Sequence, residues 1–293
     1  MTLARAFSGA LASRAVLRVV GADASSMLQS SVTNDVHALC AERLASAYAA
    51  VLTPKGKIFI DVFITRLDDE ASGEKIGFLL DVDRARVDET TNVLKRLSLR
   101  KDVRVERACD AYEVSVVLPG AESDGGGIGF DPRFDGLGRR GVTRRDAKAP
   151  ASTSMDAAHR VLRMTHGIAE GVSELADAYP LECNFDAING VSFTKGCYMG
   201  QENTARQYFR GAVRKRVVPF AFSGASVDIG APVINDNGET VGDVIAVEQD
   251  RGLMRARMKF IREALATNGV VATNGVALDV SVPTWWPAKY LES

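Results

Sequence analysis

Short runs of apolar and β-branched residues predict most of the strands in the first 120 residues. Each run ends at a polar or glycine-containing turn, which is typical of strands. The predicted strands are residues 14–20, 48–52, 58–64, 77–82, 103–105 and 112–118.

Apolar residues on one helical face and capping residues predict the helices. Val87, Thr91, Leu94 and Leu97 have the spacing of one face of a helix. The helix-capping residues are Asp23, Thr33-Asn34-Asp35 and Ser154, the last of which begins a helix from Met155 to about His166 that ends at Gly167.

Residues 217–281 contain a third set of short strands, which predicts a small β-barrel or sandwich. The sequence Asn235-Asp236-Asn237-Gly238 lies between two apolar runs and predicts a hairpin. Asn268-Gly269 and Asn274-Gly275 predict two more turns, and the Trp285-Trp286 pair predicts packing of the tail.

Residues 119–140 are rich in glycine, but no helix follows the glycines, so they lack a dinucleotide-binding fingerprint. They predict a loop that returns the chain to a first domain. The fold class is therefore α+β, with three domains: residues 1–45 plus 119–216, an inserted α+β domain at 46–118, and a C-terminal domain at 217–293.

Composition is that of a globular protein, with 46% apolar and 25% charged residues and a net charge of −1. This balance argues against nucleic acid or a membrane as a partner, and no apolar run is long enough to span a bilayer. Residues 1–19 contain arginines and no acid, as transit peptides do. We favour a first strand there, because cleavage would remove it, and we expect a cytoplasmic monomer.

The four cysteines are Cys40, Cys109, Cys183 and Cys197, and they form no Cys-x-x-Cys pair. Without metal-ligand spacing, the sequence predicts no metal site, and a reducing compartment is the expected environment.

One stretch, Lys195-Gly196-Cys197-Tyr198-Met199-Gly200-Gln201-Glu202, has the strongest functional pattern. The apolar run at residues 191–193 predicts a strand before it, and residues 202–210 predict a helix after it. Lys195 and the helix start would both favour the thiolate form of Cys197. The alternative is a buried cysteine that acts as a small hydrophobe. The polar residues around it favour a functional loop.

A basic strip follows this loop, because Arg206, Arg210, Arg214, Lys215 and Arg216 occur before the next acid. Such a strip indicates an anionic ligand or partner, although many charge runs are only solvated surfaces.

The motif Lys-Gly-Cys-Tyr-x-Gly-Gln-Glu resembles the signature of the YgfZ-type folate-binding proteins, which are related to the glycine cleavage T-protein, an aminomethyltransferase. The sequences Thr33-Asn34-Asp35-Val36, Asp131-Pro132-Arg133 and Gly138-Arg139 are also similar to that family. The resemblance implies a three-lobed T-protein-like fold with an inserted ferredoxin-like lobe and a C-terminal small β-barrel. It also implies that the chain binds tetrahydrofolate or a related folate. Its implied role is to support assembly or repair of iron–sulfur clusters in client proteins, together with assembly factors. In a eukaryote the implied compartment is the mitochondrial matrix.

The same resemblance implies a folate site in the first domain. Glu182 follows Leu181, as does the glutamate that contacts the pterin in T-proteins. Asn34 is either a helix cap or a ligand contact. The folate-binding residues implied are Asn34, Glu182, Lys195, Gly196, Tyr198, Gly200, Gln201, Glu202 and Arg206.

Two other functions stay open. The first is a folate-dependent aminomethyltransferase or demethylase, for which Asp61 is the candidate catalytic carboxylate. Active T-proteins have an Asp-Asp pair there, and here the first position is Ile60. The second is a thiol enzyme with Cys197 as nucleophile, although His159 and His166 lie far upstream in the sequence.

Overall fold

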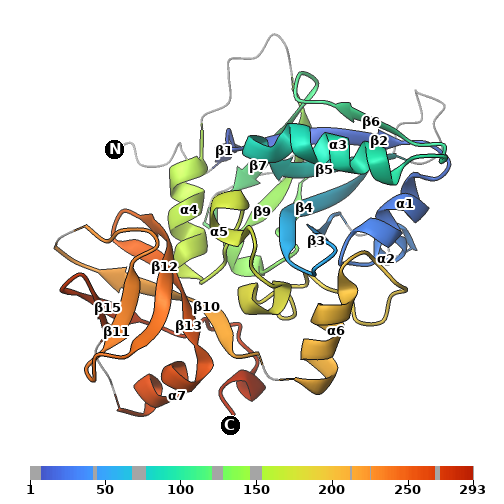
Figure 1. The fold of residues 1–293 in the computed structure, drawn as a ribbon. Helices are drawn as coiled ribbons and strands as arrows, with labels where there is room; N and C mark the ends of the chain where they lie inside the picture. The colour runs from blue at the N-terminus through green and yellow to red at the C-terminus, as the bar shows by residue number, and fades with distance from the viewer. Residues whose placement is uncertain are drawn as a thin grey trace, which may run out of the picture.

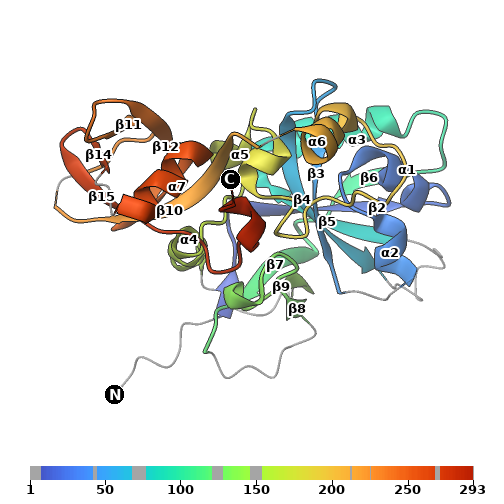
Figure 2. The same cartoon turned by 90° about the horizontal axis from the view of Figure 1, so that it is seen from below.

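The computed structural model describes residues 8–41, 45–67, 77–120, 128–145, 154–211, 213–224, 226–267 and 271–292. Two sheets and the helices around them form the larger part of the molecule, and a separate barrel lies beside them (Figures 1 and 2). The α+β fold class and the C-terminal barrel expected from the sequence are both present.

A five-stranded sheet forms the core of the larger part, and its neighbouring strands are all antiparallel. Its strands, in spatial order, are β3 (Ala47–Leu52), β4 (Ile58–Leu67), β5 (Gly77–Asp83), β2 (Arg14–Val20) and β6 (Arg104–Arg107).

Three helices supply the apolar layer on one face of this sheet. Met27, Leu39 and Leu94, one from each helix, are at most 1% exposed and pack against strand residues such as Leu17 and Ile64. The other face packs against the loops and helices that follow residue 156, so β3 and most of β4 are buried on both sides. The helices are α1 (Ala24–Ser31), α2 (Val36–Ala41) and α3 (Val87–Leu97), and the 3₁₀ turn η2 (Arg84–Arg86) precedes α3.

The expected boundary at residues 45 and 46 does not separate two sheets. β2 precedes that boundary, yet it pairs with β5 along its whole length and with β6 on its other side. Pairing with both neighbours satisfies the backbone groups of β2 and buries six of its seven residues. The sequence pattern predicts each strand but carries no direct signal for the pairing partner.

A second, four-stranded sheet contains residues on both sides of the other expected boundary. β7 pairs with β1 and with β9, so residues 112–117 join residues 139–144. Part of the glycine-rich stretch expected as a loop is therefore strand, and residues 121–127 lie outside the described part. The sheet has the order β1 (Ser8–Ala10), β7 (Tyr112–Val117), β9 (Arg139–Arg144) and β8 (Gly129–Phe130), with the 3₁₀ turn η3 (Asp135–Leu137) between β8 and β9.

In the segment from residue 154 to residue 210, the part up to about residue 175 lies between the sheets and the barrel, whereas the helix at residues 201–210 lies below the sheets and away from the barrel strands (Figure 1). Residues 191–193, expected as a strand, form none, because Ser192 N donates to Thr33 O and Phe193 stacks on Tyr208 instead. The Ser154 hydroxyl donates to Asp156 instead of capping the helix through an acceptor oxygen. The elements here are α4 (Asp156–Thr165), α5 (Val172–Leu175), the 3₁₀ turn η4 (Pro180–Cys183) and α6 (Gln201–Arg210).

Six strands close into the C-terminal barrel, and both described turns expected from the sequence join strands there. Asn274 and Gly275, with φ of 48° and 80°, form one of them, whereas Asn268-Gly269 lies outside the described residues. Trp286 packs in the barrel core, and the Trp285 indole donates to His166 O. The barrel order is β10 (Lys215–Phe222), β13 (Arg251–Arg257), β12 (Thr240–Glu248), β11 (Pro232–Asn235), β14 (Val271–Thr273) and β15 (Val276–Val280), with α7 (Met258–Thr267) and η5 (Ala288–Tyr290) outside it. Within the described ranges, every helix is too short or too polar to cross a membrane.

Candidate functional site

A set of charged side chains is buried between the five-stranded sheet, β9 and the segment 156–174. Asp81 accepts from Arg14 Nε at 2.6 Å and from Arg140 Nε at 2.8 Å. Glu170 accepts from Arg133 Nη1 at 2.7 Å and from Arg140 Nη1 at 3.0 Å. We call this set the buried ion network, and its members, each at most 7% exposed, are Arg14, Asp61, Asp81, Asp131, Arg133, Arg140, Arg163, Glu170 and Glu174.

The network pairs most of its charges internally, with four arginines against five carboxylates. Burial alone would raise the pKa of Glu170, but the surrounding arginines outweigh burial and hold that pKa well below its usual value. Phe63 lies under the guanidinium groups of Arg14, Arg133 and Arg140, which are 3.9 to 5.6 Å from its ring centre. Buried charges are tolerated only when paired in this way.

Asp61, the candidate catalytic carboxylate, belongs to this network. Arg14 Nη1 donates to both of its oxygens at 3.2 and 3.3 Å, and Gly171 N donates to it at 3.2 Å. Asp61 is 1% exposed, and burial raises its pKa although Arg14 opposes the shift. Ile60 beside it is also buried. The structure thus places this carboxylate within the protein's own ion pairs.

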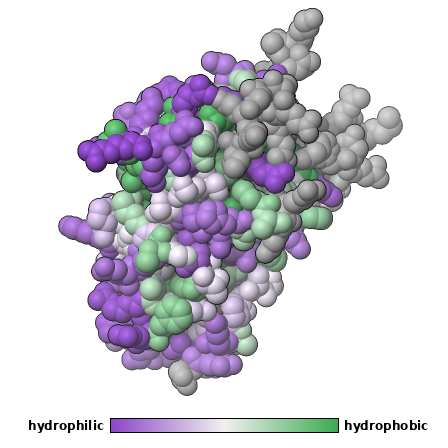
Figure 3. Space-filling view, turned by 90° about the vertical axis from the view of Figure 1, so that its right-hand side faces the viewer, coloured by the Kyte–Doolittle hydropathy of each residue, from purple (hydrophilic) through white to green (hydrophobic). Residues whose placement is uncertain are grey.

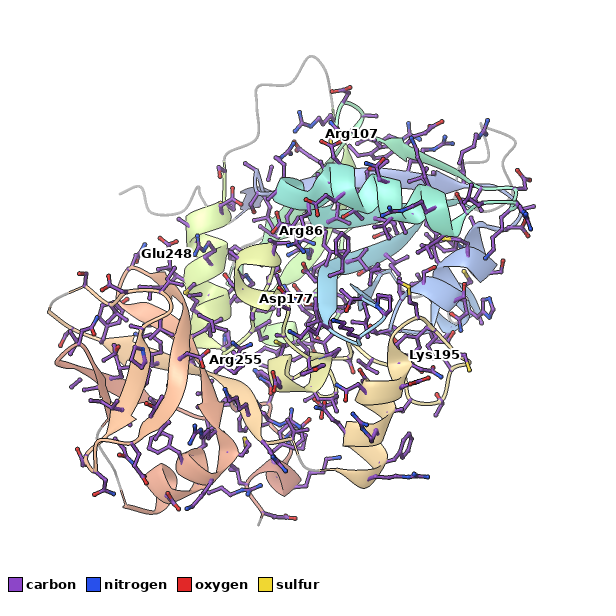
Figure 4. All side chains as sticks on the ribbon, viewed as in Figure 1. Arg86, Arg107, Asp177, Lys195, Glu248 and Arg255 are labelled. Carbon is purple, nitrogen blue, oxygen red and sulfur yellow. The ribbon has the colours of Figure 1, made fainter. Side chains whose placement is uncertain are left out.

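Lys195, labelled in Figure 4, holds the signature loop to the end of the first helix. Its ammonium donates to Gln29 O at 2.6 Å, Val32 O at 2.7 Å and Asn34 O at 2.8 Å. These carbonyls lie at and beyond the C-terminal end of α1, where main-chain acceptors lack helical partners. Burial lowers the pKa of Lys195 to about 8, against the attraction of Asp35. All three donors of this side chain are therefore in use.

The two glycines of the loop differ in their surroundings. Gly200 has φ of 81°, and a Cβ there would lie 2.5 Å from Thr53 O. Gly56, in the turn before β4, has φ of 78°, and a Cβ there would lie 2.9 Å from Gly200 O. A Cβ on Gly196 would meet no atom within 4 Å. The close backbone approach at Gly200 is therefore to the 53–57 turn of the protein itself.

The rest of the loop is fixed by its neighbours at the start of α6. Tyr198 N donates to Gln201 Oε1 at 3.1 Å, and Met199 N donates to Ser30 O at 3.2 Å. Burial raises the pKa of Tyr198 to about 12. The loop backbone is thus held at both sides of Cys197.

Cys197 is exposed, whereas Cys40 and Cys109 are half-buried and Cys183 is buried. Burial raises the pKa of the Cys183 thiol to about 12. Over the described residues, no group of three or more His, Cys, Asp or Glu side chains could hold a metal ion. The loop therefore presents one thiol to solvent, and that thiol belongs to no group of three or more such side chains in the described part of the chain.

Asn34 acts as a structural connector. Its amide nitrogen donates to Tyr48 O at 2.8 Å and to Asn189 O at 2.6 Å, and its oxygen accepts from Asp35 N. The Asp35 carboxylate caps α2 by accepting from His37 N and Ala38 N. The side-chain groups of Asn34 are thus used within the fold.

The three remaining candidate residues have fewer protein contacts. Glu182 on η4 is half-buried, and in the described part of the chain its carboxylate has no hydrogen-bond or ion-pair partner. Glu202 is exposed in the first turn of α6. Arg206 is exposed and donates to Asn203 Oδ1 at 2.7 Å. Of these, only Glu182 combines partial burial with an unpaired charge.

The basic strip does not form one surface. Arg216 is buried, and its guanidinium pairs with Asp186 at 2.9 Å and stacks on Tyr290 at 3.5 Å. Lys215 lies 3.8 Å from Asp243. Arg206, Arg210 and Arg214 are the exposed part of the strip.

A cavity of about 340 Å³ opens beside Asn34 and Tyr48. Its wall also contains Phe130, Pro132 and Asn189. The Tyr48 hydroxyl is buried and, among the described residues, has no hydrogen-bond partner. Neither Glu182 nor any residue of the signature loop lines this cavity.

Two features were missed from the sequence. The arginines of the buried ion network are scattered over the chain, and only spatial proximity makes them a set. Phe193, Tyr208 and Phe209 form an aromatic cluster, in which the Phe193 and Tyr208 rings stack with centroids 3.5 Å apart. The signal for this cluster was available, because Tyr208 and Phe209 end a helix that is otherwise polar.

Comparison with known proteins finds relatives along most of the chain. The chain is 34% identical over 306 residues to human "Iron-sulfur cluster assembly factor IBA57, mitochondrial", covering 94% of this chain and 83% of that protein. The mouse protein of the same name is 32% identical over 301 residues, covering 94% and 84%. The homologue from Mycosarcoma maydis is 36% identical over 226 residues, where the match spans about half of that relative's length, 55%.

Two further similarities concern the fold. Residues 214–288 match the family described as "CAF17, C-terminal beta-barrel domain". The glycine cleavage system aminomethyltransferase T from Bartonella henselae has a similar structure, with a TM-score of 0.64 over 97% of this chain and 87% of that chain. At 13% identity, this likeness confirms the T-protein-like fold and nothing further.

Proposed function

The chain belongs to the family of the mitochondrial iron–sulfur cluster assembly factor IBA57, and we propose that it supports the assembly of iron–sulfur clusters in client proteins through Cys197. The exposed position of Cys197 on a fixed loop is the observation that carries this proposal. Since the relatives are named as mitochondrial, the matrix is the proposed compartment if the source is eukaryotic.

The chemistry of the loop suits a cluster that is shared rather than stored. Thiolates are the usual ligands of iron–sulfur clusters, which commonly need four of them. Cys197 is exposed, and the described residues include no ligand group that could complete a site around it. A cluster bound through Cys197 would therefore take its other ligands from a partner protein. In this proposal the cluster is delivered to a client protein and is not a resident cofactor of this chain.

The fixed backbone has a role in such sharing. Lys195 anchors one side of Cys197 to three carbonyls, and Gly200 packs the other side against the 53–57 turn. A ligand held in place loses less conformational freedom when the cluster binds. The loop thus offers one thiol at a fixed position.

Folate binding is a separate proposal with narrower support. Glu182 fits a pterin, because a half-buried carboxylate without a protein partner can accept hydrogen bonds from the donor edge of that ring. Lys195, Asn34 and Gly200 do not add to such a site, since their groups contact the protein itself. The proposed folate contact therefore rests on Glu182 and on the T-protein-like fold.

Aminomethyl transfer receives no support from a specific observation. That chemistry needs a carboxylate positioned against the folate amine. Asp61 is buried and bonded to Arg14 and Gly171, and Ile60 occupies the neighbouring position. A thiol enzyme is likewise unsupported, because its cysteine needs an adjacent base. His159 is instead buried beside a small cavity next to the ion network.

The test is complementation of a strain that lacks the gene. Cys197→Ser should restore less than about a tenth of the activity of the cell's iron–sulfur enzymes, because an alcohol is a poor cluster ligand. Thr194→Ser, an exposed change in the same loop, should restore it fully at equal protein level. Full rescue by Cys197→Ser would refute the proposed role of the thiol.

Folate binding has its own test. Calorimetric titration with tetrahydrofolate should give binding that Glu182→Gln weakens about tenfold or more, since a charge-assisted hydrogen bond contributes about 1.5 to 3 kcal/mol. Asp236→Asn, an exposed change in a turn of the barrel, provides the control and should leave binding unchanged. Absence of binding to the wild type would refute the folate proposal and leave the role of Cys197 untouched.

A further inference from the structure

We propose that the aromatic cluster and the arginines around it form a docking surface for an acidic partner protein, next to Cys197. This proposal rests on the proposed function, because it concerns the partner that would supply the remaining cluster ligands. We call this set the α6 surface, and its residues are Phe193, Arg206, Tyr208, Phe209, Arg210 and Lys289.

The α6 surface exposes unusually large apolar groups. Phe209 is 66% exposed and Tyr208 is 41% exposed. Of the ten residues of α6, only Thr204 is fully buried. Contiguous exposed apolar side chains on a polar background are a mark of interaction sites. Figure 3 views the side of the molecule on which α6 lies, and green apolar groups stand there among purple polar ones.

The rings are already ordered without a partner. Phe193 stacks on Tyr208 at an angle of 13°, and Phe209 meets Tyr208 edge to face at 5.0 Å. The Lys289 ammonium lies 5.8 Å from the Tyr208 ring, so the C-terminal tail supports the same cluster. Pre-ordered aromatic side chains lose little conformational freedom on binding, and they are typical anchors of protein interfaces.

The charges of the α6 surface favour an acidic partner. Arg206, Arg210 and Lys289 are exposed and, among the described residues, none of them forms an ion pair. Glu202, in the first turn, is the only acid of α6. Unpaired arginines around aromatic rings are the composition of interface hot spots, and they attract acidic surfaces.

A protein partner fits better than single-stranded nucleic acid. Bases bind by stacking on open aromatic faces. Here the Phe193 and Tyr208 rings cover one face of each other, and the Phe209 ring and the Lys289 ammonium also lie against Tyr208, so fewer ring faces are open to a base. Cys197 follows Phe193 by four residues on the anchored loop, so their Cα atoms lie within roughly 14 Å of each other. A standard protein interface of about 800 Å² on each partner is wide enough to cover both residues.

Site-specific photo-cross-linking in cells identifies the partner. A benzophenone amino acid replaces Phe209 in the full chain, and a second chain carries it at Ile229. Ile229 is an equally exposed control on the barrel side, 63% exposed. The expected result is a specific adduct at position 209 with an acidic protein that has cysteine ligands, and none of it at position 229. The same adducts at both positions would overturn the proposal.

Titration of that purified partner then measures how much the α6 surface contributes to binding affinity. Tyr208→Ser/Phe209→Ser and Arg206→Glu/Arg210→Glu should each weaken binding about tenfold or more, the second mainly at low salt. Ile229→Ser should change it less than about twofold. Equal binding by all three variants would overturn the proposal. Binding of a short single-stranded RNA or of anionic phospholipid vesicles that is lost in Tyr208→Ser/Phe209→Ser would also overturn it.

The Cys197→Ser variant distinguishes failure of the docking surface from failure of the proposed role of the thiol. Docking without a cluster should persist in Cys197→Ser within about threefold, because the α6 surface is intact. If Cys197→Ser supports enzyme maturation in cells while the surface variants lose binding, the role of the thiol fails and the docking surface stands. If the reverse holds, the docking surface fails alone.

Discussion

The buried ion network and the signature loop both contain charged residues, but they use them in opposite ways. In the network, each carboxylate faces arginines, and every member is at most 7% exposed. In the loop, Lys195 is consumed by three carbonyls, while Cys197 and Glu202 face solvent. The charges of the network are therefore used to pair with one another. The exposed Cys197 thiol and the exposed arginines of α6 are instead available to a partner.

The largest expected difference between the two regions is in thiol reactivity. Cys197 should be alkylated at least about a thousandfold faster than Cys183. The buried thiol must wait for an opening of the native structure, and burial raises its pKa to about 12. Peptide mapping after timed alkylation of the native protein measures both rates. First labelling of half-buried Cys40 or Cys109 would contradict the assignment of the accessible thiol.

The next expected effect is on stability. Glu170→Gln should lower the free energy of unfolding by about 3 to 5 kcal/mol, because it leaves buried arginines without their shared carboxylate. Glu202→Gln, on the exposed side of the comparison, should lower it by about 1 kcal/mol at most, the size of a charge–helix interaction. Urea denaturation measures both. Similar losses of unfolding free energy in the two variants would mean that the buried ion network stabilises the fold no more than the exposed Glu202 does.

The comparison of wild type with Glu170→Gln also gives a pH test. Folding lowers the pKa of Glu170, so its contribution to stability is present above the pKa of the unfolded chain, about 4.3, and is lost as pH falls through the folded value. The stability difference between wild type and Glu170→Gln should stay constant from about pH 8 to pH 5 and shrink below that. A difference that grew on acidification would contradict the ion-pair account.

The sequence predicts local elements well and spatial partners poorly. Residues 14–20 and 112–117 are strands as expected, yet each pairs across an expected domain boundary. Strand propensity lies in the residues of one segment, whereas pairing depends on which distant segment completes the buried face. The run at residues 191–193 is the local exception, because Phe193 finds an aromatic partner on α6 and Ser192 bonds to Thr33.

For the candidate site, too, the sequence predicts the local feature and misses its spatial partners. The motif around Cys197 identifies a functional loop from sequence, and the exposure of the thiol agrees with a surface role. The carbonyl partners of Lys195 and the turn that faces Gly200 could not be predicted, because they come from residues more than 140 positions away in the chain. The same limit applies to Asp61, whose partners Arg14 and Gly171 are set only by the fold.

The smallest expected effect compares two glycines within the loop. Gly200→Ala should lower the free energy of unfolding by about 1 to 3 kcal/mol, because φ of 81° is strained for alanine and its Cβ would lie 2.5 Å from Thr53 O. Gly196→Ala should change it by about 0.5 kcal/mol at most, since nothing lies within 4 Å of that Cβ and its φ is not positive. Thermal and urea unfolding of the two variants measure the difference. Equal effects would mean that the contact with the 53–57 turn does not hold the loop in place. A selective loss in Gly200→Ala, together with faster hydrogen exchange at the start of α6, would assign the fixed position of Cys197 to this backbone contact rather than to Lys195 alone.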